Sequence, residues 1–307
     1  GYGLVLGLLV RLKRLWQSTT PEKDTIAYQP AVTFIVAAYN EADCIIEKLE
    51  NSLQFDYPKE KIRYFFVTDG SADKTPELLQ NYTFTYGINF RLFHQSERKG
   101  KIAAVNRVMP FVDTDITIYS DANTFVNKTV IKNIVRHYQD EKVGAVAGEK
   151  RIQLTEREQA SSAGEGLYWK YESLLKKWDA ELYSVVGAAG ELFSIRTELY
   201  QPIPEDTIVE DFYLTMGIAA RGYKVAYEPN AYASETGSAS IAEELKRKIR
   251  IAAGGFQALI RLAPLLNPFR YGVLSFQFIS HRILRWTLAP LSLPILLITN
   301  VLLAVQI

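Results

Sequence analysis

Two apolar runs, each stopped by polar residues, constrain the fold of this chain more than any other feature of its sequence. The first run, Val32–Ala38, gives way to Tyr39, and the second, Tyr64–Thr68, ends at Asp69. A stretch with helical periodicity follows the first run, and similar alternation continues as far as Gly148. Buried strands that alternate with helices predict a mainly parallel sheet covered on both faces. Ligands bind such sheets at the carboxyl ends of the strands, so we expect a site there.

The alternation predicts individual elements as well as the α/β class. Apolar, β-branched runs predict strands near Val32–Ala38, Arg63–Thr68, Asn89–Phe93, Ile116–Ser120 and Val143–Ala147. Helical periodicity predicts helices near Ala42–Leu53, Lys74–Asn81, Lys101–Met109 and Thr129–Tyr138. Beyond Gly148 the pattern changes to two amphipathic helices, Leu167–Tyr183 and Ile241–Leu262. Each of these two could lie in a membrane interface or pack on the sheet.

Both ends of the chain are apolar. Gly1–Val10 carries no charge and precedes a basic cluster at Arg11–Arg14, so we expect the end of a truncated transmembrane helix. Trp286–Ile307 is uncharged over 22 residues, about 33 Å as a helix and enough to cross a bilayer core of about 30 Å. A buried core helix is the alternative for this second run. The basic residues at both ends face the middle of the chain, which places that middle in the cytoplasm.

Composition excludes several classes of function. Lys and Arg number 35 against 34 Asp and Glu, so the net charge does not favour nucleic-acid binding. Cys44 is the one cysteine, which rules out an intramolecular disulfide and favours a reducing compartment. The three histidines are far apart and lack metal-ligand spacing. No Gly-x-Gly-x-x-Gly follows the first strand, which argues against a dinucleotide oxidoreductase.

Three short motifs carry candidate chemistry. Asp121 and Asn123 follow an apolar strand and could present two oxygens to one hard divalent cation. Lys101 ends the basic run Arg98-Lys99-Gly100-Lys101 at the start of a helix, a good place for phosphate. Glu210 and Asp211 are adjacent carboxylates in an apolar frame. Carboxylates in such a frame are costly unless they are paired or functional, and we favour function.

Taken in order along the chain, these motifs resemble those of the family 2 glycosyltransferases, and the membrane-embedded, polysaccharide-synthase-like branch is the most similar. The resemblance covers roughly Ala31 to Gln257. It implies a GT-A fold, a nucleotide-sugar donor (usually a UDP-sugar), Mg²⁺ or Mn²⁺, and inversion at the anomeric carbon. The matching motifs are Tyr39-Asn40-Glu41, Asp69-Gly70-Ser71, Gly100-Lys101, Asp121-Ala122-Asn123, Glu210-Asp211 and a basic helix with Arg250.

The resemblance also implies roles for residues on the donor side. Ala38, Tyr39 and Glu41 would line the nucleoside pocket, and Asp69 would hold the base. Lys101 and Arg250 would face the diphosphate. The remaining role, at the donor ribose and the metal, would fall to Asp121, with Asn123 in a metal-ligand position.

On the acceptor side, the resemblance makes Asp211 the general base, with Glu210 in support. A loop containing Gly187, Gly190 and Glu191 would border the acceptor sugar. An inverting transfer is a single displacement, so one carboxylate base suffices.

Two positions depart from the family pattern. Asn123 replaces the second acidic metal ligand, and the family's Gln-x-x-Arg-Trp signature has Arg247 and Ile251 at its Gln and Trp positions. These departures keep two alternatives open beside transfer to a saccharide or lipid-linked acceptor. One is transfer of a single sugar to a polyprenyl phosphate or glycolipid. The other is a non-catalytic membrane scaffold with the same fold.

The sequence thus predicts five parts and an integral protein of the inner or plasma membrane. Residues 1–14 end a transmembrane helix, and 15–30 form a linker. A cytoplasmic GT-A domain occupies 31–240, interface helices 241–282 and a transmembrane helix 283–307. The expected partners are a nucleotide-sugar, a saccharide or lipid acceptor and membrane lipid.

Overall fold

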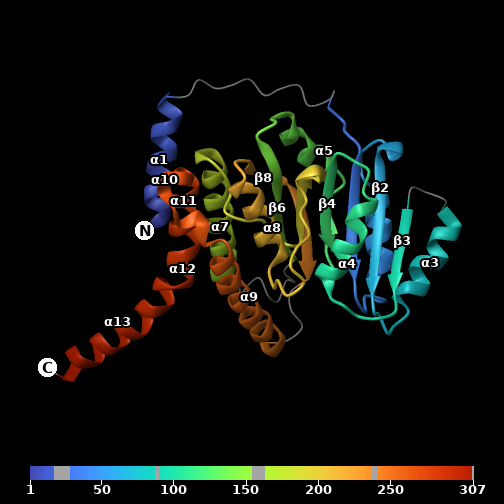
Figure 1. Cartoon of the computed structure of the whole chain (residues 1–307). Helices are drawn as coiled ribbons and strands as arrows, with labels where there is room; N and C mark the ends of the chain where they lie inside the picture. The colour runs from blue at the N-terminus through green and yellow to red at the C-terminus, as the bar shows by residue number, and fades with distance from the viewer. Residues whose placement is uncertain (17–27, 87–89, 154–162, 237–240, 306–307) are drawn as a thin grey trace.

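The computed structural model describes residues 1–16, 28–86, 90–153, 163–236 and 241–305 (Figure 1). Some elements predicted from the sequence fall partly outside these ranges. Residues 17–27 of the predicted linker, Asn89 at the start of a predicted strand, residues 237–240 at a predicted domain boundary and residues 306–307 lie outside the described residues.

The first half of the sheet forms as the alternation predicts. β1 (Val32–Ala38) pairs in parallel with β2 (Ile62–Asp69) and β4 (Ile116–Asp121), and β2 pairs in parallel with β3 (Phe90–Gln95). In the register, Ala38 lies opposite Thr68. The carboxyl ends of β1, β2 and β4 therefore meet at one edge of the sheet. The helices of this half are α2 (Ile45–Leu53), α3 (Thr75–Tyr86), α4 (Lys101–Val108) and α5 (Val130–Val135).

The second half of the sheet is mixed, which corrects the expectation of a mainly parallel sheet. The described strands form one eight-stranded sheet in the order β3-β2-β1-β4-β7-β6-β8-β5. Antiparallel pairing joins β4 to β7, β7 to β6, and β8 to β5. Only β6 had been expected from the sequence. The bounds are β5 (Phe125–Val126), β6 (Val143–Gln153), β7 (Leu192–Arg196) and β8 (Lys224–Thr236).

Alternate residues of the central strands supply two cores, one on each face of the sheet. On β1, Phe34 and Val36 point to the core that contains α2 and α5, whereas Ile35 points to the other core. That second core contains α4 and α8 (Glu210–Ala220), including Phe212. Burial on both faces explains why these strands are apolar almost throughout.

A helical layer lies beside the sheet and holds both apolar ends of the chain (Figure 1). α1 (Tyr2–Trp16) packs on α7 (Ala163–Leu182), where Leu6 and Val10 meet Leu175. The predicted helix Leu167–Tyr183 is therefore a packed helix over part of its surface. The C-terminal helices are α9 (Ile241–Arg261), α10 (Pro268–Tyr271), α11 (Val273–Gln277), a π-helical turn (Phe278–Ile283), α12 (Leu284–Trp286) and α13 (Leu288–Val305). Short 3₁₀ turns occupy Lys59–Lys61, Met109–Phe111, Arg136–Gln139, Thr197–Leu199 and Ala263–Leu266.

The C-terminal apolar run is bent. Within the described residues, no single helix has the length and apolar composition of a membrane span. The segments Val273–Trp286 and Leu288–Ala304 together have that length and composition, with a bend of 43° between them. The expected uninterrupted helix from Trp286 is therefore broken near Thr287. Side chains of α13 such as Leu288 and Leu293 are more than half exposed.

Candidate active site

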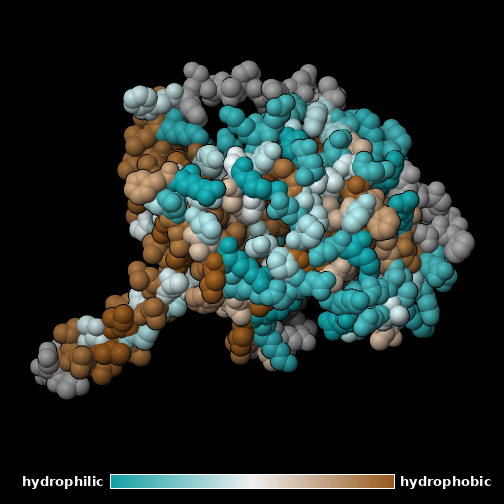
Figure 2. All heavy atoms as spheres, in the orientation of Figure 1, coloured by the Kyte–Doolittle hydropathy of each residue, from teal (hydrophilic) through white to brown (hydrophobic). Residues whose placement is uncertain are grey.

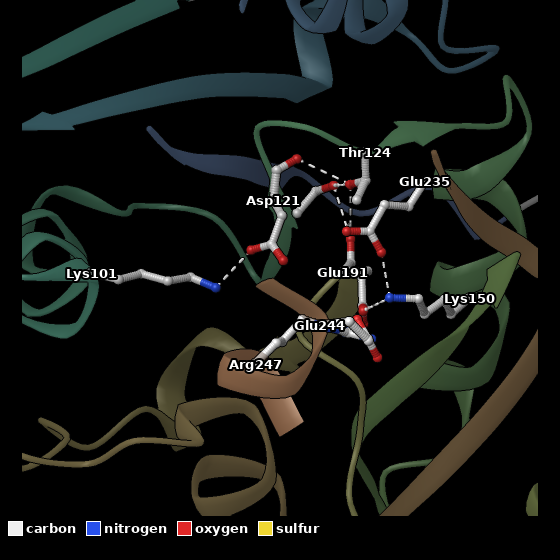
Figure 3. Close-up of polar contacts among 9 residues, drawn as sticks. Lys101, Asp121, Thr124, Lys150, Glu191, Glu235, Glu244 and Arg247 are labelled. Carbon is white, nitrogen blue, oxygen red and sulfur yellow. Dashed lines mark hydrogen bonds and ion pairs between the residues drawn. The ribbon is translucent and has the colours of Figure 1, made fainter. Parts of the chain in front are cut away.

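Lys101 joins two carboxylates that lie far apart in the sequence. Its ammonium nitrogen lies 2.7 Å from Asp121 Oδ1 at the end of β4 and 2.6 Å from Glu210 Oε1 at the start of α8. Burial opposes the charge of Lys101, but Asp121 and Glu210 outweigh burial and hold its pKa above the usual value. The structure thus brings together three residues that the sequence placed in a site, and Figure 3 shows the contact of Lys101 with Asp121.

Asp211 follows Glu210 in the first turn of α8 and faces the same site. Burial raises the pKa of Asp211 to about 7, and the charge of Glu210 adds to that effect. A Cβ built on Gly190 would lie 3.6 Å from Asp211 Oδ2 and 3.9 Å from Lys101 Nζ. The loop around Gly190 therefore runs directly past the carboxylate. A carboxylate with a pKa near neutrality can accept a proton in its ionised form and release it again.

Gly187, in the same loop, cannot carry a side chain. Its φ is +86°, and a Cβ there would lie 2.2 Å from Cδ2 of Phe212, the neighbour of Asp211. The loop from 187 to 191 therefore packs closely against the start of α8, because Gly187 leaves room for the Phe212 ring.

We predict that Gly187→Ala lowers the free energy of unfolding by at least about 2 kcal/mol, because it adds a clash to a left-handed backbone. Gly217→Ala is the matched control: Gly217 lies inside α8 with no atom near its Cβ position. In a helix, alanine is favoured over glycine, so the control should be neutral or more stable. Denaturant unfolding followed by circular dichroism measures both. Equal stabilities for the two variants would contradict this close packing of the loop.

Asp69 fastens the end of β2 to the basic loop before α4. Its Oδ2 accepts hydrogen bonds from the backbone N–H groups of Lys99 (2.9 Å) and Gly100 (2.6 Å). Its Oδ1 is buried, has no hydrogen-bond partner among the described residues, and lies 3.6 Å from Nη1 of Arg107. One carboxylate oxygen thus shapes the loop, and the other keeps an open acceptor position.

The residues after β1 form the neighbouring wall. Asn40 adopts a φ of +55°, and its Oδ1 accepts from the N–H of Ala72 at 2.8 Å. Ala38 is buried, whereas Tyr39 is partly exposed, and the Arg98 guanidinium stacks 3.7 Å from the centre of the Tyr39 ring. Burial raises the pKa of Glu41, whose backbone N–H donates to Oγ1 of Thr75 at 2.9 Å. These contacts join the segments that follow β1 and β2.

A buried lysine that the sequence reasoning missed supports the end of β4. Lys48 of α2 is fully buried and donates to Ser120 Oγ (2.7 Å) and to the carbonyl of Thr124 (2.6 Å). Burial lowers the pKa of Lys48 to about 7, and the charge of Asp121 acts in the opposite direction. Its spacing within α2, on the face of Ile45 and Leu49, was the available signal.

A second network missed from the sequence includes Glu191, at the end of the loop that contains Gly187 and Gly190. The nearly buried Lys150 of β6 contacts the carboxylates of both Glu191 and Glu235 (Figure 3). The available signal was Lys150 two residues after Gly148, close to the end of an apolar run. A lysine that is buried there needs an acidic partner. Glu191 is thereby held by a cation that is distinct from Lys101.

Comparison with known proteins places this arrangement in a family. The model of glycosyl transferase family 2 matches residues 33–203, which include the loop of Gly190 and the end of β4. This chain belongs to glycosyl transferase family 2. It is 29% identical over 237 residues to a poly-β-1,6-N-acetyl-D-glucosamine synthase of Staphylococcus aureus, an alignment that covers 75% of this chain and 56% of that protein. The corresponding synthase of Staphylococcus epidermidis is 24% identical over the same length. The chain therefore spans about half the length of these curated relatives.

Solved structures show the same GT-A type of fold. A mannosyltransferase from Pyrobaculum calidifontis, in complex with GDP-Man and Mn²⁺, matches with a TM-score of 0.74 and 25% identity. That match covers 99% of this chain and 89% of the mannosyltransferase. Staphylococcus aureus TarS in complex with UDP-GlcNAc matches with a TM-score of 0.59 and 14% identity, over 81% of this chain and 72% of that one. The second likeness concerns the fold alone.

On α9, Arg247 and Arg250 differ in their contacts with other charged residues. Arg250 is exposed and makes no polar contact within the described part of the chain. Arg247 instead pairs with Glu244 (2.9 Å), and the charges of Glu235 and Glu191 also help to hold its pKa above the usual value. The structure therefore brings Arg247, which stands at the family's Gln position, near the network of Lys150, Glu191 and Glu235.

The predicted metal ligands lie at the end of β4 but do not form a closed cage. Among the described residues, no three His, Cys, Asp or Glu side chains are grouped to hold a metal ion. Asn123 is exposed, and Asp121 contacts Lys101 through Oδ1. Magnesium is commonly bound by one or two protein oxygens together with substrate phosphates. Two protein ligands without a closed cage therefore suit a metal site that the phosphates of a bound nucleotide-sugar would complete.

Proposed function

We propose that this chain is an inverting, metal-dependent glycosyltransferase that moves a sugar from a nucleotide-sugar to a saccharide or lipid-linked acceptor at the cytoplasmic face of a membrane. The observation that carries the proposal is the Lys101 ammonium held between Asp121 and Glu210, with Asp211 beside them at the glycine loop. This arrangement sets a cation for a leaving diphosphate next to a carboxylate that can take a proton.

In the proposed reaction, Asp211 accepts the proton of an acceptor hydroxyl while its oxygen attacks the anomeric carbon. The bond from that carbon to the diphosphate breaks on the opposite side, and the configuration inverts. Lys101 stabilises the charge that develops on the diphosphate, because a preorganised cation needs no rearrangement at that moment. Glu210 holds Lys101 in place and, through its charge, helps to raise the pKa of Asp211.

Mg²⁺ or Mn²⁺ would be held by Asp121 and Asn123 together with the donor diphosphate. The side-chain oxygens of Asp121 and Asn123 fit a hard cation, since carboxylate and amide oxygens are the usual protein ligands of such an ion. When bound, the ion supplies charge stabilisation to the leaving group. The Mn²⁺ in the similar mannosyltransferase supports this assignment.

On the donor side, Asp69, Tyr39, Glu41 and Ala38 would contact the nucleoside. The open Oδ1 of Asp69 can accept a hydrogen bond from a base N–H. The names of the staphylococcal relatives favour N-acetylglucosamine as the sugar and a polysaccharide as the product. A UDP-sugar is therefore the first donor to test.

A second candidate is the transfer of one sugar to a polyprenyl phosphate or glycolipid. Ile251 at the position of the family's tryptophan favours it, and the likeness to a mannosyltransferase in complex with GDP-Man over 99% of this chain supplies a donor for it. An aromatic ring can stack on a sugar, and isoleucine cannot. GDP-mannose is the corresponding donor to test.

Contact with a membrane is supported by the apolar surface of the helical layer. Leu4 on α1 and Leu291 on α13 are exposed by 80% and 60%, and α9 adds the exposed Ile260 at 77%. Apolar side chains dominate this margin and the projecting α13 in the space-filling view (Figure 2). Exposed apolar areas of this extent mark sites of membrane or protein contact.

A donor-binding panel tests the proposed function. Purified protein is heated with UDP-GlcNAc, UDP-glucose or GDP-mannose, each with and without Mn²⁺, and the melting temperature is recorded. A ligand at 100 times its dissociation constant stabilises the folded state by about 2.7 kcal/mol. We expect one donor to raise the melting temperature by several degrees and only with metal. No shift with any donor would favour the scaffold alternative.

The pH dependence of turnover follows from Asp211. Because its carboxyl must be ionised to accept a proton, and burial raises its pKa to about 7, kcat should rise with pH up to about 7 and then level off. Initial rates at saturating donor and acceptor between pH 5 and 9 measure this limb. A flat profile down to pH 5 would exclude Asp211 as the base.

A further inference from the structure

A cavity of about 650 Å³ lies away from the residues assigned to sugar transfer, in the helical layer between α1, α7 and the C-terminal helices. Its volume is in the range of sites for small organic ligands. Most of its lining is apolar or aromatic. The lining includes Val5, Leu175, Phe276, Leu284 and Leu288.

One polar atom at this cavity, Nε2 of His281, lacks a hydrogen-bond partner among the described residues, and Oε2 of Glu172 lies 4.0 Å from it. His281 lines the cavity, is only 3% exposed, and places Nδ1 2.6 Å from Oδ2 of the buried Asp179. Its other nitrogen, Nε2, is buried and has no hydrogen-bond partner among the described residues. A buried polar group without a partner costs about 1–3 kcal/mol, so Nε2 is an atom that a ligand could satisfy.

The contacts of Asp179 define how that histidine is oriented. Asp179 Oδ1 accepts hydrogen bonds from the hydroxyl of Tyr2 and from Nε2 of Gln277 (3.0 Å). Oδ2 is left for the N–H at Nδ1 of His281. With Nδ1 committed, a group in the cavity meets Nε2. A hydroxyl suits that position because it can both donate and accept.

The charges at the cavity favour an uncharged head group. Arg285 pairs with Glu172, and the Tyr168 hydroxyl also contacts Arg285. Both charged residues line the cavity, and their charges cancel locally. A phosphate would have to separate this pair, whereas a hydroxyl-bearing head would not.

The cavity is continuous with the exposed apolar helices. Leu288 and Ala289 of α13 belong to its lining, and Leu288 is 62% exposed. Val5 of α1, on another wall, is 48% exposed. We propose that this cavity binds the hydrocarbon chain of a membrane lipid whose uncharged, hydroxyl-bearing head group forms a hydrogen bond with His281 Nε2.

A photoreactive lipid tests the proposal without any sugar donor, so its result is independent of the proposed transferase function. The probe is a monoacylglycerol with a diazirine in its acyl chain, added to full-length protein in phosphatidylcholine vesicles. Labelled peptides are mapped by mass spectrometry. We expect label on α7 near Tyr171 or on the segment from His281 to Ser292, which are parts of the cavity wall.

Two tryptophan variants separate the cavity from general contact with lipid. Ala289→Trp places an indole at the lining and should reduce labelling of the cavity wall at least fivefold. Ala304→Trp makes the same change on an exposed position of the same helix, outside the lining, and should leave labelling unchanged. Equal labelling in both variants, or label spread evenly along α13, would overturn the proposal.

The head group is tested through His281. His281→Asn keeps an amide N–H for Asp179 but has no atom at the position of Nε2. It should weaken labelling by the monoacylglycerol about two- to tenfold, the value of one hydrogen bond. Labelling by a diazirine alkane without hydroxyls should not change. Unlabelled lysophosphatidic acid and unlabelled monoacylglycerol can each be added to compete with the probe. If lysophosphatidic acid reduced labelling more than monoacylglycerol did, the proposal of an uncharged head group would be contradicted.

Discussion

Replacing Asp211 by asparagine is expected to lower kcat about 10²–10⁴-fold while donor affinity stays within about twofold of the wild type. The magnitude is that of general base catalysis, which an amide cannot perform. Donor affinity should persist because the residues proposed to contact the nucleoside lie at the end of β1, just after it, or at the end of β2, and not on α8. Single-turnover kinetics measures the chemical step, and calorimetric titration measures donor binding.

Asp206→Asn is the matched control for that substitution. Asp206 precedes the same helix but is largely exposed, with a side-chain exposure of 71%, and pairs with Arg261. Its loss should change kcat less than threefold, because exposed ion pairs contribute little. Similar losses in the two variants would show that the region, and not Asp211, sets the rate.

Asp211→Asn has a second expected effect, on the stability of the folded protein. The pKa of Asp211 is higher in the folded protein than in the unfolded chain, so the contribution of Asp211 to stability is greatest at low pH and is lost as pH rises through about 7. Asparagine resembles the uncharged carboxyl. Asp211→Asn should therefore melt at a higher temperature than the wild type at pH 8, and this difference should shrink as pH falls towards 4. Thermal melts across that pH range provide the comparison.

Lys101→Met is expected to reduce kcat/KM about 10²–10³-fold. Losing one preorganised group that stabilises developing charge typically has an effect of this size. Methionine keeps much of the aliphatic stem but leaves Asp121 and Glu210 without their shared cation. Those two carboxylates would then lie near an incoming diphosphate without the lysine between them, so we expect both weaker donor binding and slower transfer.

Lys99→Met provides the comparison for Lys101. Lys99 lies in the same loop, its side chain is 52% exposed, and its ion pair with Glu97 is long at 3.6 Å. We expect less than a threefold change in kcat/KM for this variant. If both lysine variants lose activity equally, the loop acts through its total charge, and the specific role of Lys101 is wrong.

The sequence predicted the parallel half of the sheet because the information there is local. β1, β2 and β4 are largely apolar runs that stop at or just before a polar residue, and β1 has the bounds expected from its sequence. Asp69 and Asp121 could be placed at one edge for the same reason, since parallel strands bring their carboxyl ends together. The spacing of residues could not supply the partners of these two carboxylates. Asp69 accepts from the loop N–H groups of Lys99 and Gly100, and Asp121 pairs with the ammonium of Lys101.

The parts that sequence reasoning missed depend on long-range pairing. β7 is a five-residue strand, and β8 includes Pro229, so neither has the uniform pattern of β1. Their pairing with β6 and β4 brings Glu235 and Glu191 to Lys150. Nothing local in the chain connects Lys150 with residues that are 41 and 85 positions away.

The family resemblance assigned Arg250 to the diphosphate by motif, and this role stays a prediction. Arg247, three positions earlier, is the residue whose charge interacts with Glu191 and Glu235. The substitution of the family's Gln by Arg247 thus carries structural information that the matching Arg250 does not.

The most direct measurement of the central claim is nucleotide release by full-length protein in vesicles. UDP- and GDP-sugars are supplied in turn with Mg²⁺ or Mn²⁺, together with oligosaccharide and membrane lipid acceptors, and Asp211→Asn is assayed beside the wild type. We predict metal-dependent release from one donor that falls at least 100-fold in the variant, the lower bound for a general base. Release at the same rate from both proteins, or no release from any donor, would contradict the assignment.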